Sequence, residues 1–130
     1  MQKAVVARLR GDAGVTALVP ADGIFDRSMR PELPICIVLG EDQVVREPLT
    51  YQDDHVRVYF TLHLWQQAQD FSVIKNLGDA IRKAMRARFV VPGIYVVYSS
   101  FGDARYMRDP GGEYLHGVLT FSALIQEPQT

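Results

Sequence analysis

The stretch HVRVYFTLHLWQQ (residues 55–67) alternates apolar and polar side chains almost without a break. A period of two places successive side chains on opposite faces of a β-strand, so this pattern predicts a long strand with two distinct faces. The apolar face consists of Val56, Val58, Phe60, Leu62 and Leu64. The other face consists of His55, Arg57, Tyr59, Thr61, His63 and Trp65. We expect the first face to enter a core, and the second raises the question of function.

Two other segments, one at the N-terminus and one after this strand, have apolar residues at the spacing of an amphipathic helix. A main helix is predicted after the strand, with Asp70 or Ser72 as its N-cap. Its apolar positions are Ile74, Leu77, Ile81, Ala84 and Met85. A first helix is predicted at the N-terminus, where Gly11 ends a run whose apolar positions are Val5, Val6 and Leu9.

Three further strands are predicted from β-branched and aromatic runs. Residues 35 to about 45 begin with ICIVLG, which is apolar on both faces and favours a central position. Residues 94–101 and 113–126 form two more strands. The DPGG turn at 109–112 makes them a hairpin, with residues 104–108 in its ascending arm. The order predicts an α+β fold, a small antiparallel β-sheet with two main helices packed on one face.

Composition narrows the class of protein. The 130 residues suit a single domain spanning 1–130, and 48% hydrophobic with 22% charged residues is ordinary for a soluble globular chain. The formal net charge of −1 argues against a domain that chiefly holds nucleic acid. One cysteine, Cys36, forms no internal disulfide. No run is long enough for a signal peptide or a membrane span, so we expect a protein that is made and used in a cytoplasm.

No combination of residues completes a catalytic, cofactor or metal site. His55 and His63 lie eight residues apart on one strand, roughly 26 Å at the usual rise, and cannot share an ion. His63 and His116 can meet across strands, but a third ligand is missing. The serines lack a nucleophile elbow, and the DPGGEY segment lacks the lysine of a phosphate loop. We therefore predict a protein that is not an enzyme and that carries no cofactor.

The polar face of the 55–67 strand favours a protein interface. Tyrosine, tryptophan and arginine are the residues most enriched at the energetic centres of interfaces. Tyr59, His63 and Trp65 are the candidates for contact between subunits. The alternative is that Tyr59 and Trp65 pack against each other, or under a loop, within a monomer.

Two charged segments have their own alternatives. The segment RYMRDPGGEY (105–114) is a candidate loop for docking a partner, and its candidate residues are Arg105, Arg108, Asp109, Gly111 and Gly112. It can equally be a plain solvated hairpin. The basic cluster Arg82, Lys83, Arg86 and Arg88 fits a solvated helix end, where cations suit the helix dipole, or a contact with acidic protein or passing DNA.

Taken in order, several segments resemble the tail-completion family, the small tail-terminator proteins of long-tailed bacteriophages and gene transfer agents. The segments are ARLRGDAGVTALV, PICIVLGE, TLHLW, IKNLGDAIRKAM and RYMRDPGGEYLHGVLTFSAL. The resemblance spans nearly the whole chain and is strongest in 61–65, in 108–110 and at His116, Gly117 and Phe121. Gly112 departs from it, since a more ordinary residue is expected there.

The resemblance implies a small antiparallel sheet with flanking helices, and no cofactor or enzymatic step. It implies a homo-oligomeric ring, usually of six subunits, on the last ring of the tail tube. Such a ring ends tube polymerisation, meets the major tail tube protein and the head-tail connector, and lets DNA pass through its lumen unread. The protein would be assembled in the host bacterial cytoplasm and lie at the head-tail junction of the particle, away from any membrane. The alternatives are a head-closure or connector protein on the head side, and a small-molecule-binding α+β domain.

Overall fold

The computed structural model describes residues 2–25, 34–47, 55–86 and 95–126. The helical elements, in chain order, are α1 (Gln2–Arg10), α2 (Ala13–Thr16), the 3-10 turn η1 (Ala21–Gly23) and α3 (Ser72–Arg86). The strands are β1 (Ile24–Phe25), β2 (Ile35–Glu47), β3 (His55–Gln67), β4 (Tyr95–Arg108) and β5 (Tyr114–Gln126).

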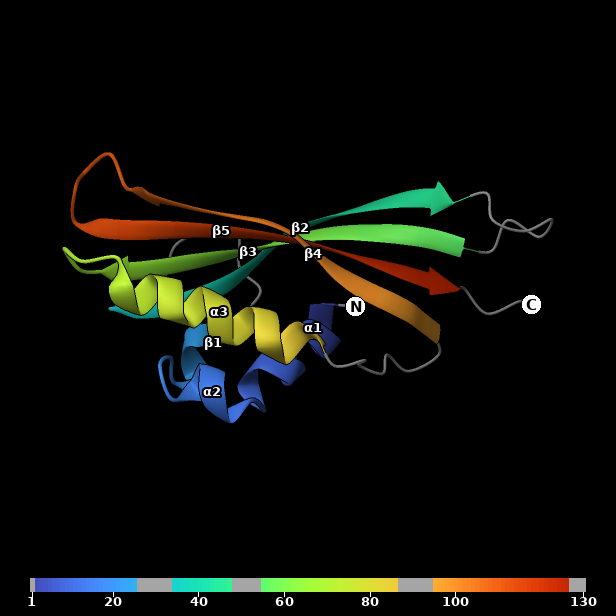
Figure 1. Cartoon of the computed structure of the whole chain (residues 1–130), viewed down its shortest axis with the longest axis horizontal. Coiled ribbons are helices and arrows are strands. Elements are labelled where there is room, and N and C mark those ends of the chain that lie inside the picture. The colour runs from blue at the N-terminus through green and yellow to red at the C-terminus, as the bar shows by residue number, and fades with distance from the viewer. Residues whose placement is uncertain (1, 26–33, 48–54, 87–94, 127–130) are drawn as a thin grey trace.

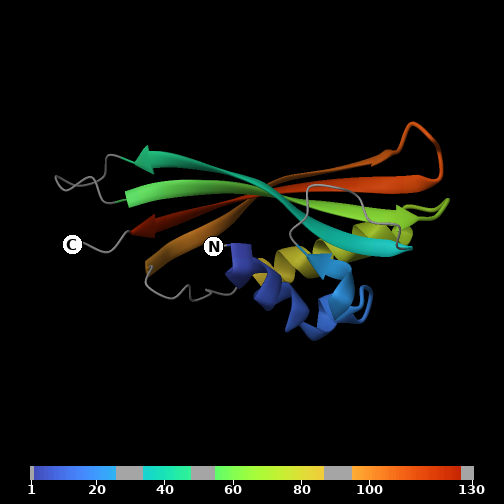
Figure 2. The same ribbon diagram turned by 180° about the vertical axis from the view of Figure 1, so that it is seen from behind.

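The strands form one sheet in the order β1-β2-β3-β5-β4. The pairs β2–β3, β3–β5 and β5–β4 are all antiparallel, as predicted. The two-residue strand β1 adds a parallel pairing to β2, with Ile24 opposite Ile37. The helices α1, α2 and α3 lie together on one side of the sheet, and among the described residues no helix lies on the other side, which we call the open face (Figures 1 and 2). The predicted α+β class is therefore confirmed.

The alternation of β3 determines which face is buried. Its predicted apolar residues are all at most 8% exposed, whereas Tyr59 on the other face is 42% exposed. Opposite β3, the strand β5 contributes Leu115, Leu119, Phe121, Ala123 and Ile125 to the same core. The helices complete this core with Val5, Leu9, Ile74, Leu77, Ile81, Ala84 and Met85. At its centre the rings of Phe60 and Phe121 stack, with their centroids 5.5 Å apart.

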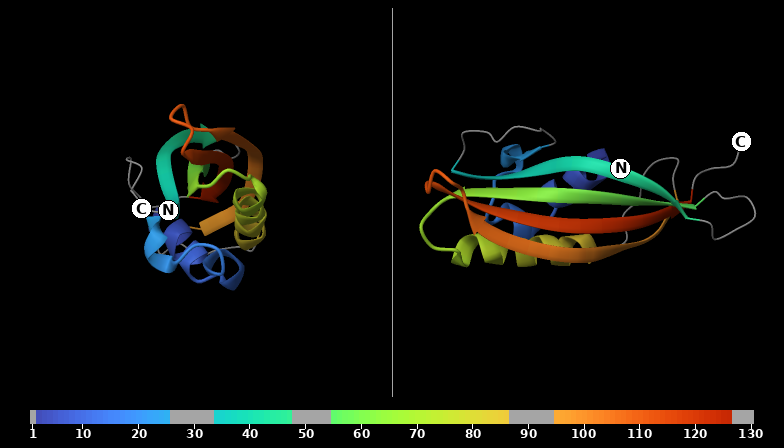
Figure 3. Two further views of the ribbon diagram at one scale, coloured as in Figure 1. Left: turned by 90° about the vertical axis from the view of Figure 1, so that its left-hand side faces the viewer. Right: turned by 90° about the horizontal axis from the view of Figure 1, so that it is seen from above.

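The long strands reach past the helix layer at the end where β5 finishes (Figure 3). Val44 in β2 pairs with the buried Val58, yet it is 61% exposed. The apolar lining of the sheet thus continues beyond the helices.

The first strand of the final hairpin is longer than predicted. The sequence predicts a strand over 94–101 and places 104–108 in the ascending arm of the hairpin, and in the structure β4 joins the two without a break, from Tyr95 to Arg108. A register shift between Phe101 and Asp103 absorbs the irregular residue Gly102. A Cβ at Gly102 would lie 2.7 Å from the Thr120 hydroxyl, so the bulge needs glycine at this position.

Tyr106 fixes α3 to the sheet through two glycines. Its ring covers Gly117 on β5, where an added Cβ would lie 3.1 Å from two ring carbons. Its hydroxyl reaches the backbone of Gly78 in α3, so closely that a Cβ there would collide with it. Burial, with Asp79 nearby, raises the pKa of the Tyr106 phenol above its usual range. An aromatic ring laid over a strand glycine is a known means of pinning sheet register.

Leu62→Ala should lower the free energy of unfolding by about 2–5 kcal/mol, because it leaves a cavity in the core under α3. Leu62 is fully buried. Denaturant unfolding of the purified protein measures this. The neighbouring Thr61→Ala, on the open face, is the matched control and should change stability by less than about 0.5 kcal/mol. Equal effects at the two positions would mean that the faces of β3 are assigned wrongly.

Gly78→Ala should destabilise the protein by about 1–3 kcal/mol, because the new methyl group displaces Tyr106. In a Tyr106→Phe background the hydroxyl is gone, and most of that cost should disappear. In the Tyr106→Phe background, the higher helix propensity of alanine, worth roughly 1 kcal/mol, offsets the destabilisation that remains. A double-mutant cycle of thermal or denaturant unfolding measures the coupling. An identical cost of Gly78→Ala in both backgrounds would contradict the contact.

Candidate functional site

The open face of the sheet carries the three residues proposed from the sequence as interface candidates. The register places Trp65 opposite His116 on β5 and Cys36 on β2. His63 lies one step further along β3, and Tyr59 lies four residues from it on the same face. Tyr59 is exposed, and His63 and Trp65 are half-buried. The three residues therefore share one surface, as their spacing predicts.

Two of these residues, Trp65 and His63, contact the ring of His116. The indole of Trp65 lies on the imidazole of His116 with centroids 3.8 Å apart and ring planes 6° from parallel. The rings of His63 and His116 have centroids 5.1 Å apart and planes at 22°. The sequence allowed His63 and His116 to meet across strands, but only the register of β3 with β5 shows that His116 lies directly opposite Trp65.

The two histidines also share a hydrogen bond. Nδ1 of His63 lies 2.9 Å from Nε2 of His116, so one ring nitrogen donates and the other accepts. The pair cannot keep this bond when both rings are protonated. Burial lowers the pKa of His63, which favours its neutral form at neutral pH.

Beside the rings, a band of hydroxyl groups crosses β5 and β4. The Thr120 hydroxyl donates to the Asp103 carboxylate at 2.6 Å and accepts the Asp103 backbone N–H at 3.0 Å. The hydroxyls of Ser100 and Ser122 lie 3.1 Å apart. These groups satisfy one another within the subunit. Sequence reasoning missed the band because its members come from two strands whose register includes a bulge.

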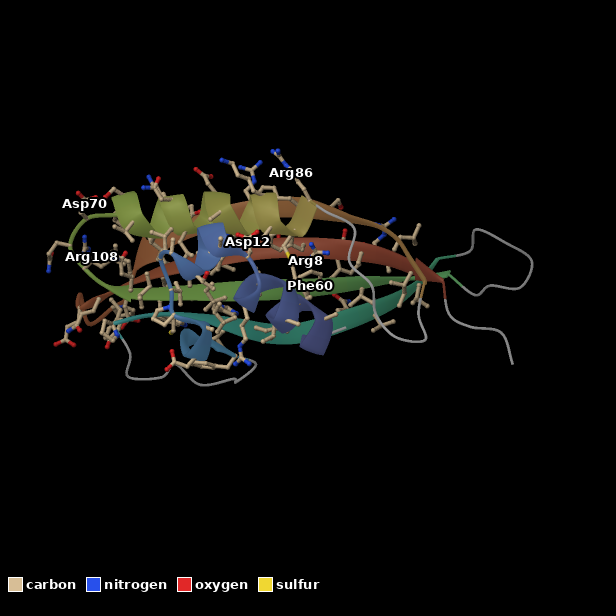
Figure 4. The ribbon with its side chains drawn as sticks, turned by 90° about the horizontal axis from the view of Figure 1, so that it is seen from below. Arg8, Asp12, Phe60, Asp70, Arg86 and Arg108 are labelled. Carbon is tan, nitrogen blue, oxygen red and sulfur yellow. The ribbon has the colours of Figure 1, made fainter. Side chains whose placement is uncertain are left out.

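The docking-loop candidates divide between the open face and the tip of the β4–β5 hairpin. Arg105 is exposed and pairs with Val118, on the open face. Arg108 instead turns toward α3, where its guanidinium donates to the carbonyl of Gln69 at 2.9 Å and lies over the Phe71 ring. Figure 4 shows Arg108 beside Asp70 at this end of the molecule. The hairpin shaft is therefore anchored to the β3–α3 connection.

The tip itself is a tight turn. The Asp109 N–H donates to the Tyr114 carbonyl, and the Gly112 N–H donates to the Asp109 carbonyl, both at 2.8 Å. Gly112 has a φ of 78°, a conformation that side-chain-bearing residues rarely adopt. The unusual glycine of the sequence thus has a conformational reason. Gly111 beside it is exposed, so the turn is presented to solvent.

Both outer strands of the sheet offer backbone edges. Within the described ranges, β4 pairs only with β5, so its outer edge has no strand partner. On the opposite side, β1 covers β2 only at Ile37 and Val38. Unpaired strand edges invite pairing with another chain.

No group of three or more histidine, cysteine, aspartate or glutamate side chains is placed to hold a metal ion among the described residues. Within the same ranges, no helix has the length and apolar character needed to cross a membrane.

Comparison with known proteins identifies the family. The sequence profile of the family described as tail completion protein gp17 matches residues 3–126. A chain in the virion of a native gene transfer agent particle has 23% identity and a TM-score of 0.82, with 97% of this chain and 94% of that chain covered. The gp17 protein of bacteriophage SPP1 has 14% identity and a TM-score of 0.60, with 99% and 91% covered. These two structures share the fold.

A search of curated proteins found no matching sequence. The profile match nevertheless runs through every helix and strand of the fold, from α1 to the end of β5. The chain therefore belongs to the tail completion protein gp17 family.

Proposed function

We propose that this chain caps the tail tube as a homo-oligomeric ring, ends tube polymerisation and provides the surface to which the head is joined. The observation that carries the proposal is the family match across residues 3–126, which makes the chain a structural tail protein. The ring is a hexamer in this proposal, and it lies at the head-tail junction of a phage or gene transfer agent particle.

The open face and the strand edges supply what a ring requires. A closed ring needs a heterologous interface, in which two different patches of each subunit meet head to tail. The helices already bury much of one face of the sheet, which leaves the other face and the strand edges for contacts between subunits. The other face carries Trp65, the exposed Tyr59 and the exposed Met107, which are residue types common at interfaces.

The ring stack suits Trp65 for such a contact. Because the indole stacks on the His116 ring, less side-chain entropy remains to be lost on association. The stacking on His116 is also a contact within the subunit, different from the alternative in which Trp65 packs against Tyr59 or under a loop. We assign Tyr59, His63 and Trp65 to the subunit interface on this basis.

Two further roles are assigned: docking through the hairpin, and contact of the ring with other virion proteins. The hairpin residues Arg105, Asp109, Gly111 and Gly112 dock a protein partner, with Arg108 holding the hairpin in place. The partners are the major tail tube protein on one side of the ring and the head-tail connector on the other. DNA passes through the lumen without being read, which fits a net charge of −1. No step in this role requires catalysis or a cofactor.

Deletion of the gene should give tails of uncontrolled length, or tails that never join heads, because nothing then closes the tube. Electron microscopy of particles from the deletion strain measures tail length and joining. The wild-type gene supplied in trans is the control and should restore normal particles. Normal particles from the deletion strain would exclude the proposal, and this protein bound to tail-less heads would place it on the head side instead.

Trp65→Ala should weaken subunit association by on the order of 2 kcal/mol or more, because it removes a large ring from the interface. Sedimentation of the assembled ring measures association, and thermal unfolding of the same protein measures folding. Val73→Ala is the matched control, since Val73 is 37% exposed on α3, away from the open face. Unchanged assembly of Trp65→Ala at micromolar concentration would assign Trp65 to packing within the subunit alone.

A further inference from the structure

A small pocket lies between the C-terminal half of α3 and the β4 edge of the sheet. Its residues are Arg82, Met85, Arg86, Ser100, Phe101 and Phe121. Met85 and Phe121 are buried and form an apolar floor, while the two arginines are exposed at its rim. Its volume of about 70 Å³ is well below the roughly 300 Å³ and more of small-molecule sites. The pocket therefore fits a single side chain of a protein partner.

The positive charge at the rim of the pocket favours an acidic side chain as the occupant. Arg82 lies over the Phe101 ring, with the guanidinium carbon 4.3 Å from the centroid, and forms a long 4.0 Å ion pair with Asp79. Arg86, one turn further on, has no ion-pair partner among the described residues, and Lys83 beside it is also exposed. This end of α3 presents an excess of positive charge around an apolar floor, which is complementary to a carboxylate on a methylene stem.

The same chain carries a suitable carboxylate at its hairpin tip. The tip segment 109–113 contains Asp109 and Glu113 and no cation. Glu113 is exposed, immediately after the turn that Gly112 closes. Arg108 ties the shaft of the hairpin to the Gln69 carbonyl, so the tip is held in one orientation. A rigid acidic projection loses little freedom when it docks.

The tip cannot reach the pocket of its own subunit. Arg108 anchors the hairpin beside the N-terminal end of α3, whereas Arg86 lies at the other end of that helix (Figure 4). A helix from Ser72 to Arg86 spans roughly 20 Å at the usual rise per residue. Tip and pocket are thus two different, complementary patches on one molecule, as a head-to-tail ring requires.

We propose that the hairpin tip of one subunit docks into the Arg82–Arg86 pocket of the next, with the Glu113 carboxylate paired to the Arg86 guanidinium. The occupant of the pocket is therefore a second copy of this chain. The contact rests on the proposed ring and supplies its direction, because each subunit gives a tip to one neighbour and receives a tip from the other. It narrows the docking role of the hairpin from a protein partner in general to the neighbouring subunit.

Charge reversal tests the contact in the deletion strain. Arg86→Glu and Glu113→Arg, each supplied alone, should lower the yield of normal-length, head-joined particles by about tenfold or more, because like charges then face each other. Lys75→Glu is the matched control, since it makes the same charge change on α3 outside the pocket, and it should restore particles as the wild type does. Thermal unfolding of each purified variant checks that the subunit still folds.

Two rescue arms make the test specific to a head-to-tail contact. The double variant Arg86→Glu with Glu113→Arg re-forms an opposite pair at every interface and should restore particles. Co-expression of the two single variants should also restore them, because alternating subunits then meet with opposite charges on each side. Normal yields from both single variants, or failure of both rescue arms, would overturn this contact. The wild-type gene supplied in the same strain tests the proposed ring function independently of this contact.

Discussion

The pairing of β3 with β5 is the constraint on which the rest of the molecule depends. The register runs unbroken from His55 opposite Gln126 to Gln67 opposite Tyr114. A slip by one residue would reverse every side chain of β3, moving Leu62 to the open face and His63 into the core. One set of backbone hydrogen bonds therefore fixes two things together: the apolar surface that the helices cover, and the stacking of Trp65 on His116 on the opposite face.

Much of the fold could be predicted from the sequence because its strongest signals are local. The alternation of residues 55–67 identified both faces of β3, and the helical spacing from Ile74 to Met85 identified the buried side of α3. Features that depend on contacts between distant segments were not predictable in this way. The parallel pairing of β1 involves only two residues, and the continuity of β4 depends on a bulge that Gly102 permits against Thr120. No pattern within either segment encodes these contacts.

The candidate site also combines features that local sequence patterns predict with features that depend on contacts between distant segments. Tyr59, His63 and Trp65 were placed on one surface by their spacing alone, and the structure brings them there. The stacking of Trp65 on His116 follows from the register of β3 with β5, and the turn of Arg108 toward the Gln69 carbonyl follows from the path of the chain after β3. From the sequence, the basic end of α3 fitted a solvated helix end or a contact with acidic protein or passing DNA. The apolar floor of Met85 and Phe121 beside the arginines became visible only in the structure.

The contact of Tyr106 with Gly78 and Gly117 joins three elements that are distant in sequence. Because Gly78 and Gly117 have no side chains, there is room for the Tyr106 side chain. A change at any one of the three alters which residues the other two tolerate, so their effects on stability are not independent. In evolutionary terms we expect the order of substitutions to matter. A change of the tyrosine to a smaller residue would relax the constraint on both glycines, whereas a side chain added at either glycine would meet the tyrosine ring or hydroxyl.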